Sequence, residues 1–135
     1  MKLVTSLAFT IVMMTFQAQA ATTVCKETHA TTSTQKEVVI EEIANIRSQA
    51  AYGIDYDAVW KVKVQINEIK NGQRTQLQSF NAVATSADVV YNIDAKRKNG
   101  VELWRYFDEE NQDGFTMKSA DGKTVTYRLN CQDVH

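Results

Sequence analysis

Polar and apolar residues alternate along this chain in the way that half-buried β-strands require. Between Ala58 and Ile66 one face carries Trp60, Val62, Val64 and Ile66, and the other carries Lys61, Lys63 and Gln65, with the period of two residues that a strand imposes. A second alternating stretch runs from Ala87 to Ala95, with Val90 as its apolar exception. Both stretches predict strands that place one face on a core.

The stretch from Gln76 to Thr85 is β-prone but less regular. Leu77 and Phe80 are three residues apart, so they share a face only if an extra residue interrupts the alternation. We therefore expect a β-bulge near Gln78 and Ser79.

The chain has no proline, so its turns are predicted from dipeptides that end in glycine. Asn-Gly or Asp-Gly lies between β-prone stretches at residues 70–73, 98–101 and 120–123, and these pairs are the strongest short-range indication of a β-hairpin. Three successive hairpins predict a meander.

The last hairpin also has a predicted register. A three-residue loop over 120–122 pairs Met117 with Val125 and Phe115 with Tyr127, and so keeps the large apolar side chains on one face. A two-residue Asp-Gly turn would instead place Met117 opposite Thr126.

The segment from Lys36 to Tyr52 fits two structures. Thr34 and Glu37 form a capping-box pattern, and apolar residues then recur at helical spacing. Against a helix, Val38–Ile40 are three successive β-branched residues, which suit a buried strand. We favour the strand.

The predicted fold is mainly β, an antiparallel up-and-down meander of about 7–8 strands forming a small barrel or sandwich. The alternative is an α+β fold with a helix at about 35–51.

The first residues have the parts of a secretory signal peptide. Lys2 precedes an apolar run over 3–16, and cleavage after Ala20 satisfies the small-x-small rule with Ala18. The apolar run is shorter than the roughly 20 residues that a spanning helix needs. We expect a signal peptide over 1–20 and a single β-rich domain over 21–135, exported to a periplasm or secreted, without membrane insertion of the mature chain.

Cys25 and Cys131 are the only cysteines and lie near the two ends of the mature chain. Cysteines of exported proteins usually pair, because the compartment is oxidising. A disulfide between them would tie the first strand to the last. The alternatives are two buried thiols or an intermolecular bridge.

The charges do not indicate a nucleic-acid partner. Without Lys2, 14 basic residues face 16 acidic residues, for a net charge of −2. The basic run Lys96–Lys98 fits a solubilising hairpin tip better than a site for an anionic partner.

Catalytic patterns are also missing from the sequence. The histidines are His29 and His135, and no serine lies in a Gly-x-Ser-x-Gly turn. Asp108 and Glu110 have the spacing of a hydrolytic carboxylate pair, but the acidic, amide-rich run around them does not predict the apolar pocket that separates two pKa values. We expect no enzyme activity and no zinc site.

The acidic stretch DEENQDG over 108–114 is a partial match to a calcium loop. Glu109, Asn111 and Asp113 occupy the first three oxygen-ligand positions, with Gly114 at the turn position. The position of the bidentate glutamate is Ala120, so the motif is incomplete. Calcium is the one candidate cofactor, and the alternative is a solvated turn between strands.

The stretch VELWRYF over 101–107 carries large apolar side chains on both faces of a predicted strand. One face must meet the core, and the other is covered by a second layer or forms a contact surface. Trp104, Tyr106 and Phe107 are the candidate binding patch.

Together these features predict an exported, non-enzymatic binding or interaction module whose partner is an unknown protein. In size, disulfide and β content the chain resembles small periplasmic lysozyme or protease inhibitors, although it carries no motif of those families. The alternative is a small β-barrel that carries an apolar ligand in a cavity lined by Trp60, Tyr91 and Trp104.

Overall fold

The computed structural model describes residues 21–28, 33–46, 58–87, 90–106, 108 and 110–134. These residues form a closed barrel of eight antiparallel strands in chain order, with β8 paired to β1. The strands are β1 Thr22–Glu27, β2 Thr34–Asn45, β3 Ala58–Lys70, β4 Gln73–Ala87, β5 Val90–Ala95, β6 Val101–Tyr106, β7 Gly114–Lys118 and β8 Thr124–Val134. The one helix of this part of the chain is a single turn, α1 Lys96–Asn99. The predicted up-and-down meander is confirmed, in its barrel form.

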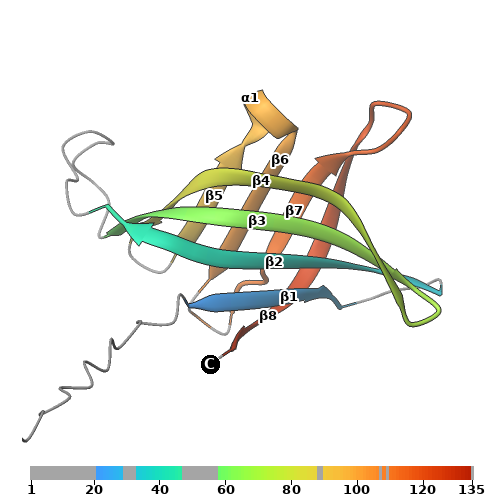
Figure 1. Cartoon of the computed structure of the whole chain (residues 1–135), viewed down its shortest axis with the longest axis horizontal. Helices are drawn as coiled ribbons and strands as arrows, with labels where there is room; N and C mark the ends of the chain where they lie inside the picture. Colours follow the sequence, from blue (N-terminus) through green and yellow to red (C-terminus); the bar gives the residue numbers. More distant parts are fainter. Residues whose placement is uncertain are drawn as a thin grey trace, which may run out of the picture.

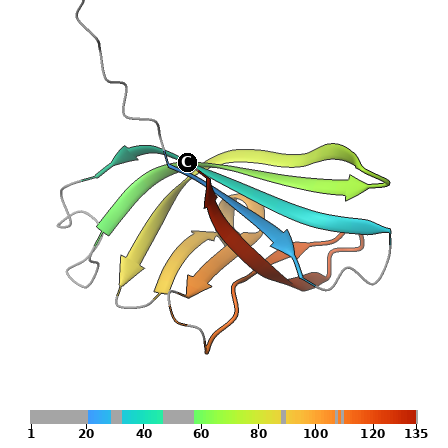
Figure 2. The ribbon, with the colours of Figure 1, turned by 90° about the horizontal axis from the view of Figure 1, so that it is seen from below.

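The barrel is flattened into two curved layers. Strands β1–β4 form one layer and β5–β8 the other, and the layers meet where β1 pairs with β8 and where β4 pairs with β5 (Figures 1 and 2). The hairpin of β3 and β4 is the longest and extends past the second layer (Figure 1).

The segment that fitted both a helix and a strand forms strand β2 in its described part. Val38 and Ile40 are buried in the core, and β2 lies between β1 and β3, so its backbone groups are paired on both edges. The β-branched run therefore decided the structure, and the helix alternative is wrong for Thr34–Asn45.

The three predicted hairpins are all present. Asn71 and Gly72 form a two-residue turn with φ angles of 51° and 76°, as a type I′ turn requires. In the last hairpin Phe115 pairs with Tyr127 and Met117 with Val125, so the predicted register is confirmed. The middle hairpin has a longer connection, in which α1 and Gly100, with a φ of 70°, join β5 to β6.

Strand β4 contains the expected bulge, one position earlier than predicted. Ile66 pairs with Gln78 and Asn67 pairs with Gln76, so Leu77 is the extra residue. Leu77 is exposed and Phe80 is buried. The bulge therefore does not bring Leu77 onto the core face beside Phe80, which was the reason for expecting it.

The core fills the space between the two layers with side chains from all eight strands. It consists of Cys25, Val38, Ile40, Val62, Val64, Ile66, Phe80, Ala84, Tyr91, Ile93, Ala95, Val101, Leu103, Phe115, Met117 and Leu129. Phe115 stacks on Tyr127 with ring centroids 4.8 Å apart. Within the described residues, no helix has the length and apolar character needed to cross a membrane.

The predicted disulfide joins Cys25 to Cys131 across 106 residues of sequence. The two cysteines are direct cross-strand partners on β1 and β8. The disulfide thus lies at the seam where the first and last strands close the barrel. Such a bond is compatible with an oxidising compartment.

Candidate functional site

The barrel has a gap in its second layer because β7 is short. Strand β7 begins only at Gly114, opposite Trp104 of β6 and Arg128 of β8, whereas β6 and β8 continue past these residues. Asp113 bridges the gap: its carboxylate Oδ1 accepts the amide N–H of Tyr106 at 2.8 Å, and its carbonyl oxygen accepts the N–H of Leu129 at 2.8 Å. The acidic stretch thus takes the place of the missing part of β7.

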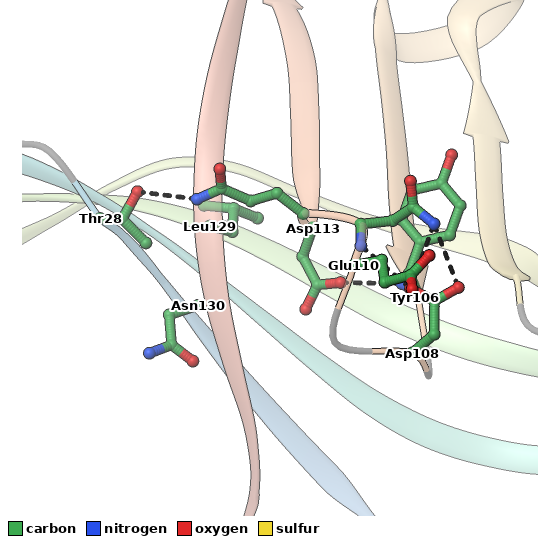
Figure 3. Close-up of a pocket in the computed structure, with 9 residues that line it drawn as sticks. Thr28, Tyr106, Asp108, Glu110, Asp113, Leu129 and Asn130 are labelled. Atoms are coloured by element: carbon green, nitrogen blue, oxygen red, sulfur yellow. Dashed lines mark hydrogen bonds between the residues drawn. The ribbon is translucent and has the colours of Figure 1, made fainter.

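A surface depression of about 430 Å³ lies beside this bridge. We call it the loop depression; its lining residues are Thr28, Tyr106, Asp108, Glu110, Asn111, Gln112, Asp113, Leu129 and Asn130. Figure 3 shows Thr28 and Asn130 on one side, Tyr106, Asp108 and Glu110 on the other, and Asp113 between them. Residues from three distant parts of the chain therefore form one recess.

Internal hydrogen bonds shape the loop that lines this recess. Asp108 accepts the backbone N–H of Asn111 at 3.0 Å and also hydrogen bonds from its side-chain amide. The side chain of Gln112 donates to Thr28 Oγ1 and accepts from Arg128 at 2.9 Å. These bonds hold the loop against β8 and the end of β1.

Trp104 fixes the other side of the loop. Its indole Nε1 donates to the carbonyl oxygen of Gln112 at 3.2 Å, and its ring lies so close to Gly114 that a Cβ there would be 2.7 Å from Trp104 Cζ2. Because Trp104 alternates with the fully buried Leu103, it lies on the outer face of the barrel.

Arg105 points inward, towards the barrel end behind the gap. Its Nη1 lies 3.2 Å from Asp133 Oδ1 and 3.4 Å from Thr23 Oγ1, and its Nε lies 3.9 Å from Asp113 Oδ2. The side chain is 15% exposed. Arg105 therefore connects β6, β8, β1 and the loop where the strand ladder is interrupted.

Two further titratable groups face this barrel end. Burial raises the pKa of Glu42, and the charge of Asp133 raises it further. Burial also raises the pKa of Tyr91 far above its ordinary value, with a smaller contribution from Glu42. Tyr91 packs on Trp60, with ring centroids 5.7 Å apart. Ionisation of the Glu42 carboxyl and of the Tyr91 phenol is therefore unfavourable at this end of the barrel.

The electrostatic character of the loop depression is different. Asp108 and Glu110 form no ion pair with a described residue, and Glu110 is exposed. Asp113 lies close to Arg105, whereas Asp108 accepts hydrogen bonds from the neutral side chain of Asn111. The depression therefore offers negative charge next to an aromatic residue, Tyr106.

The calcium prediction concerns Glu109, Asn111 and Asp113. Glu109 lies outside the described residues, and the carboxylate of Asp113 is already used by Tyr106 and Arg105. Within the described chain, no group of three or more His, Cys, Asp or Glu side chains is arranged to hold a metal ion. Calcium binding stays a prediction.

The structure brings together two candidates that the sequence left separate. Trp104 and Tyr106 of the predicted binding patch contact the loop over 108–113, while Phe107 lies outside the described residues. Sequence reasoning missed Thr28 and Asn130, for which no local pattern exists. It also missed Arg105, although its alternation with Leu103 indicates an inward side chain.

Comparisons with protein-family models, with curated proteins and with solved structures found no match to this chain.

Proposed function

We propose that the protein is an exported binding module without catalytic activity, and that the loop depression binds a basic group of a partner protein. The carrying observation is the pair of carboxylates of Asp108 and Glu110, which lie beside Tyr106 on the rim of a recess of about 430 Å³. A lysine or arginine side chain entering this recess would meet negative charge and an aromatic ring, both of which attract cations.

The construction of the site supports a role in binding. Its walls are held by hydrogen bonds to strands β6 and β8, and Trp104 and Asp113 fix the loop at both sides. A recess held in this way loses little conformational freedom when a partner binds, which favours affinity. The proposed export relies on the predicted signal peptide over 1–20, which lies outside the described residues, and is compatible with the disulfide.

The carrier alternative has less support. Trp60 and Tyr91 pack against each other inside the barrel, but Trp104 lies on the outer face and cannot line the same cavity. None of these aromatic residues lines the loop depression or the three other surface depressions of about 320 to 340 Å³ that the described residues form. The interior positions are occupied by buried side chains instead.

The experiment is affinity capture from the exported fraction of cells, with the immobilised protein and two charge-reversal variants. Glu110→Lys changes the loop depression, and Glu41→Lys makes the same change at an exposed position of β2. The proposal expects a partner that is retained by the wild type and by Glu41→Lys, lost from Glu110→Lys, and released by added salt.

Two results contradict the proposal. One is a partner that Glu110→Lys retains as well as the wild type does. The other is the absence of any retained protein together with saturable binding of an apolar fluorescent probe, which would favour the carrier.

A further inference from the structure

Strand β4 leaves most of one edge without a neighbouring strand. On one side β4 pairs with β3 from Gln73 to Ser86. On the other side only Ala84–Ala87 pair with β5. Within the described part of the chain, residues 73–83 have no strand on this second edge, and alternate residues there direct their N–H and C=O groups away from β3.

The part of this edge nearest to β5 is a regular, unprotected strand. Gln78–Val83 pair with β3 without interruption, whereas Leu77 marks a bulge. The sequence QSFNAV contains no charge, no proline and no glycine. Natural edge strands usually carry such residues to prevent pairing with other chains, and an edge without them can accept an added strand.

The missing neighbour results from the early turn of β5. Strand β5 leaves the ladder after Ile93 pairs with Ala84, and the chain turns away through α1 immediately after Ala95. A strand added along Gln78–Val83 would lie in line with β5, with one end next to α1. It would occupy the place that a longer β5 would fill.

The end of this vacant position is positively charged. Helix α1 carries Lys96, Arg97 and Lys98 beside a surface depression of about 330 Å³ that these residues line with Asp94 and Ala95. Lys96 is paired with Glu102, while Arg97 and Lys98 are exposed. A carboxylate at the end of an added strand would meet complementary charge here.

We propose that the edge Gln78–Val83 binds an extended segment of another protein by β-strand addition, and that this segment carries carboxylate side chains at the end that adjoins α1. The inference rests on the proposed role as a binding module and assigns that module a second contact surface. Backbone hydrogen bonds supply the pairing, and the basic turn selects the charge of the segment.

A second copy of this chain fits the edge less well. Antiparallel pairing of two such edges places α1 of each copy towards Arg74 of the other, because the Val83 end of one strand faces the Gln78 end of its partner. Arg74, which pairs with Glu37, would then face three basic residues. Like charges oppose this arrangement.

The test uses two synthetic peptides with the same β-prone core. One is Glu-Glu-Thr-Val-Thr-Val-Thr-Glu-Glu, and the other has lysine in place of every glutamate. Amide hydrogen exchange of residues 78–83 is measured by NMR with each peptide. At a concentration about ten times its Kd, the acidic peptide is expected to slow alternate amides of this edge about tenfold, while the lysine peptide has no effect.

A variant reports on the role of the basic turn. Arg97→Glu combined with Lys98→Glu changes exposed residues of α1 and leaves β4 intact, so the preference should shift from the acidic peptide to the lysine peptide. The proposal is overturned if neither peptide slows exchange at millimolar concentration or if both slow it equally. It is also overturned if exchange slows with protein concentration alone, which would indicate a second copy.

This test separates the edge from the loop depression. Glu110→Lys should bind the acidic peptide as the wild type does, because the two surfaces share no residue. If peptide binding fails while capture still depends on Glu110, only the edge proposal is wrong. If capture fails while the peptide binds, the proposal for the loop depression is wrong and the proposal for the edge stands.

Discussion

Gly114 is the residue at which the end of the loop, the outer tryptophan Trp104 and the start of β7 meet. Its missing side chain lets the ring of Trp104 approach the backbone, and this position of the ring directs Nε1 to the carbonyl oxygen of Gln112. The wall of the loop depression thus depends on a residue that has no functional group of its own.

Replacing Gly114 with alanine is expected to destabilise the protein by about 1 to 3 kcal/mol, because the added methyl group overpacks a close contact. The new Cβ would lie 2.7 Å from Trp104 Cζ2 and 2.9 Å from the carbonyl oxygen of Tyr127. Urea unfolding measures the change. Thr116→Ala, which removes atoms at the next outward position of β7, is the control and should lower the free energy of unfolding by less. Equal losses in the two variants would contradict the steric explanation.

Glu42 provides a prediction about pH. Its folded pKa is raised by burial and by Asp133, so ionisation of Glu42 costs the folded state more than the unfolded state. The contribution to stability is complete below the ordinary pKa of 4.5 and is lost as pH rises through the folded pKa. Glu42→Gln should therefore raise the thermal midpoint at pH 7 and leave it nearly unchanged at pH 4, as measured by calorimetry. A gain of the same size at both pH values would contradict the prediction.

Single residues also show the limit of sequence reasoning. The register of Phe115 with Tyr127 was predicted from alternation, whereas the inward position of Arg105 was missed, although its alternation with Leu103 indicates it. Thr28 and Asn130 join the depression only because β1 and β8 pair across the closure of the barrel. No local sequence pattern predicts that contact.

At the scale of elements, the connection between β5 and β6 shows how burial overrides a local turn preference. A two-residue Asn-Gly turn at Asn99 would place Ile93 opposite Tyr106. The longer connection through α1 instead pairs Ile93 with Leu103 and Ala95 with Val101, all of them buried. The turn residues predicted the hairpin, and the apolar faces set its register.

The short β7 has the largest consequence for the site, and Asp113 is the residue that compensates for it. Asp113→Ala removes the acceptor for the Tyr106 N–H and one partner of Arg105, so it should cost about 1 to 3 kcal/mol for the unsatisfied groups. Asp113→Asn keeps a hydrogen-bond acceptor and should cost less. Chemical denaturation of both variants checks the order, and equal losses would show that the hydrogen bond to Tyr106 is unimportant.

At the scale of the whole molecule, the disulfide and the β1–β8 pairing act together to close the barrel. The sequence placed both cysteines in the first and last elements, and this placement was correct. It could not distinguish a barrel from a sandwich, because that depends on whether distant strands pair at the two seams. The interruption of the ladder along β4 and between β6 and β8 was likewise not predictable, since it depends on strand lengths.

Removal of the disulfide tests the strength of this closure. Its loop spans 106 residues, for which the loop-entropy model gives about 4 to 5 kcal/mol. The double variant Cys25→Ala/Cys131→Ala should therefore lose up to about this amount in guanidinium unfolding. The wild type under reducing conditions is the control. Identical stability of the oxidised and reduced wild-type protein would contradict a stabilising role.

The central claim is that the protein acts through its outer surface at the loop depression. The most direct test places a photo-crosslinking amino acid at position 110 or at position 41 in cells that export the protein. The account predicts a protein adduct from position 110 that position 41 does not form. Adducts of equal yield from both positions, or no adduct from position 110, would contradict it.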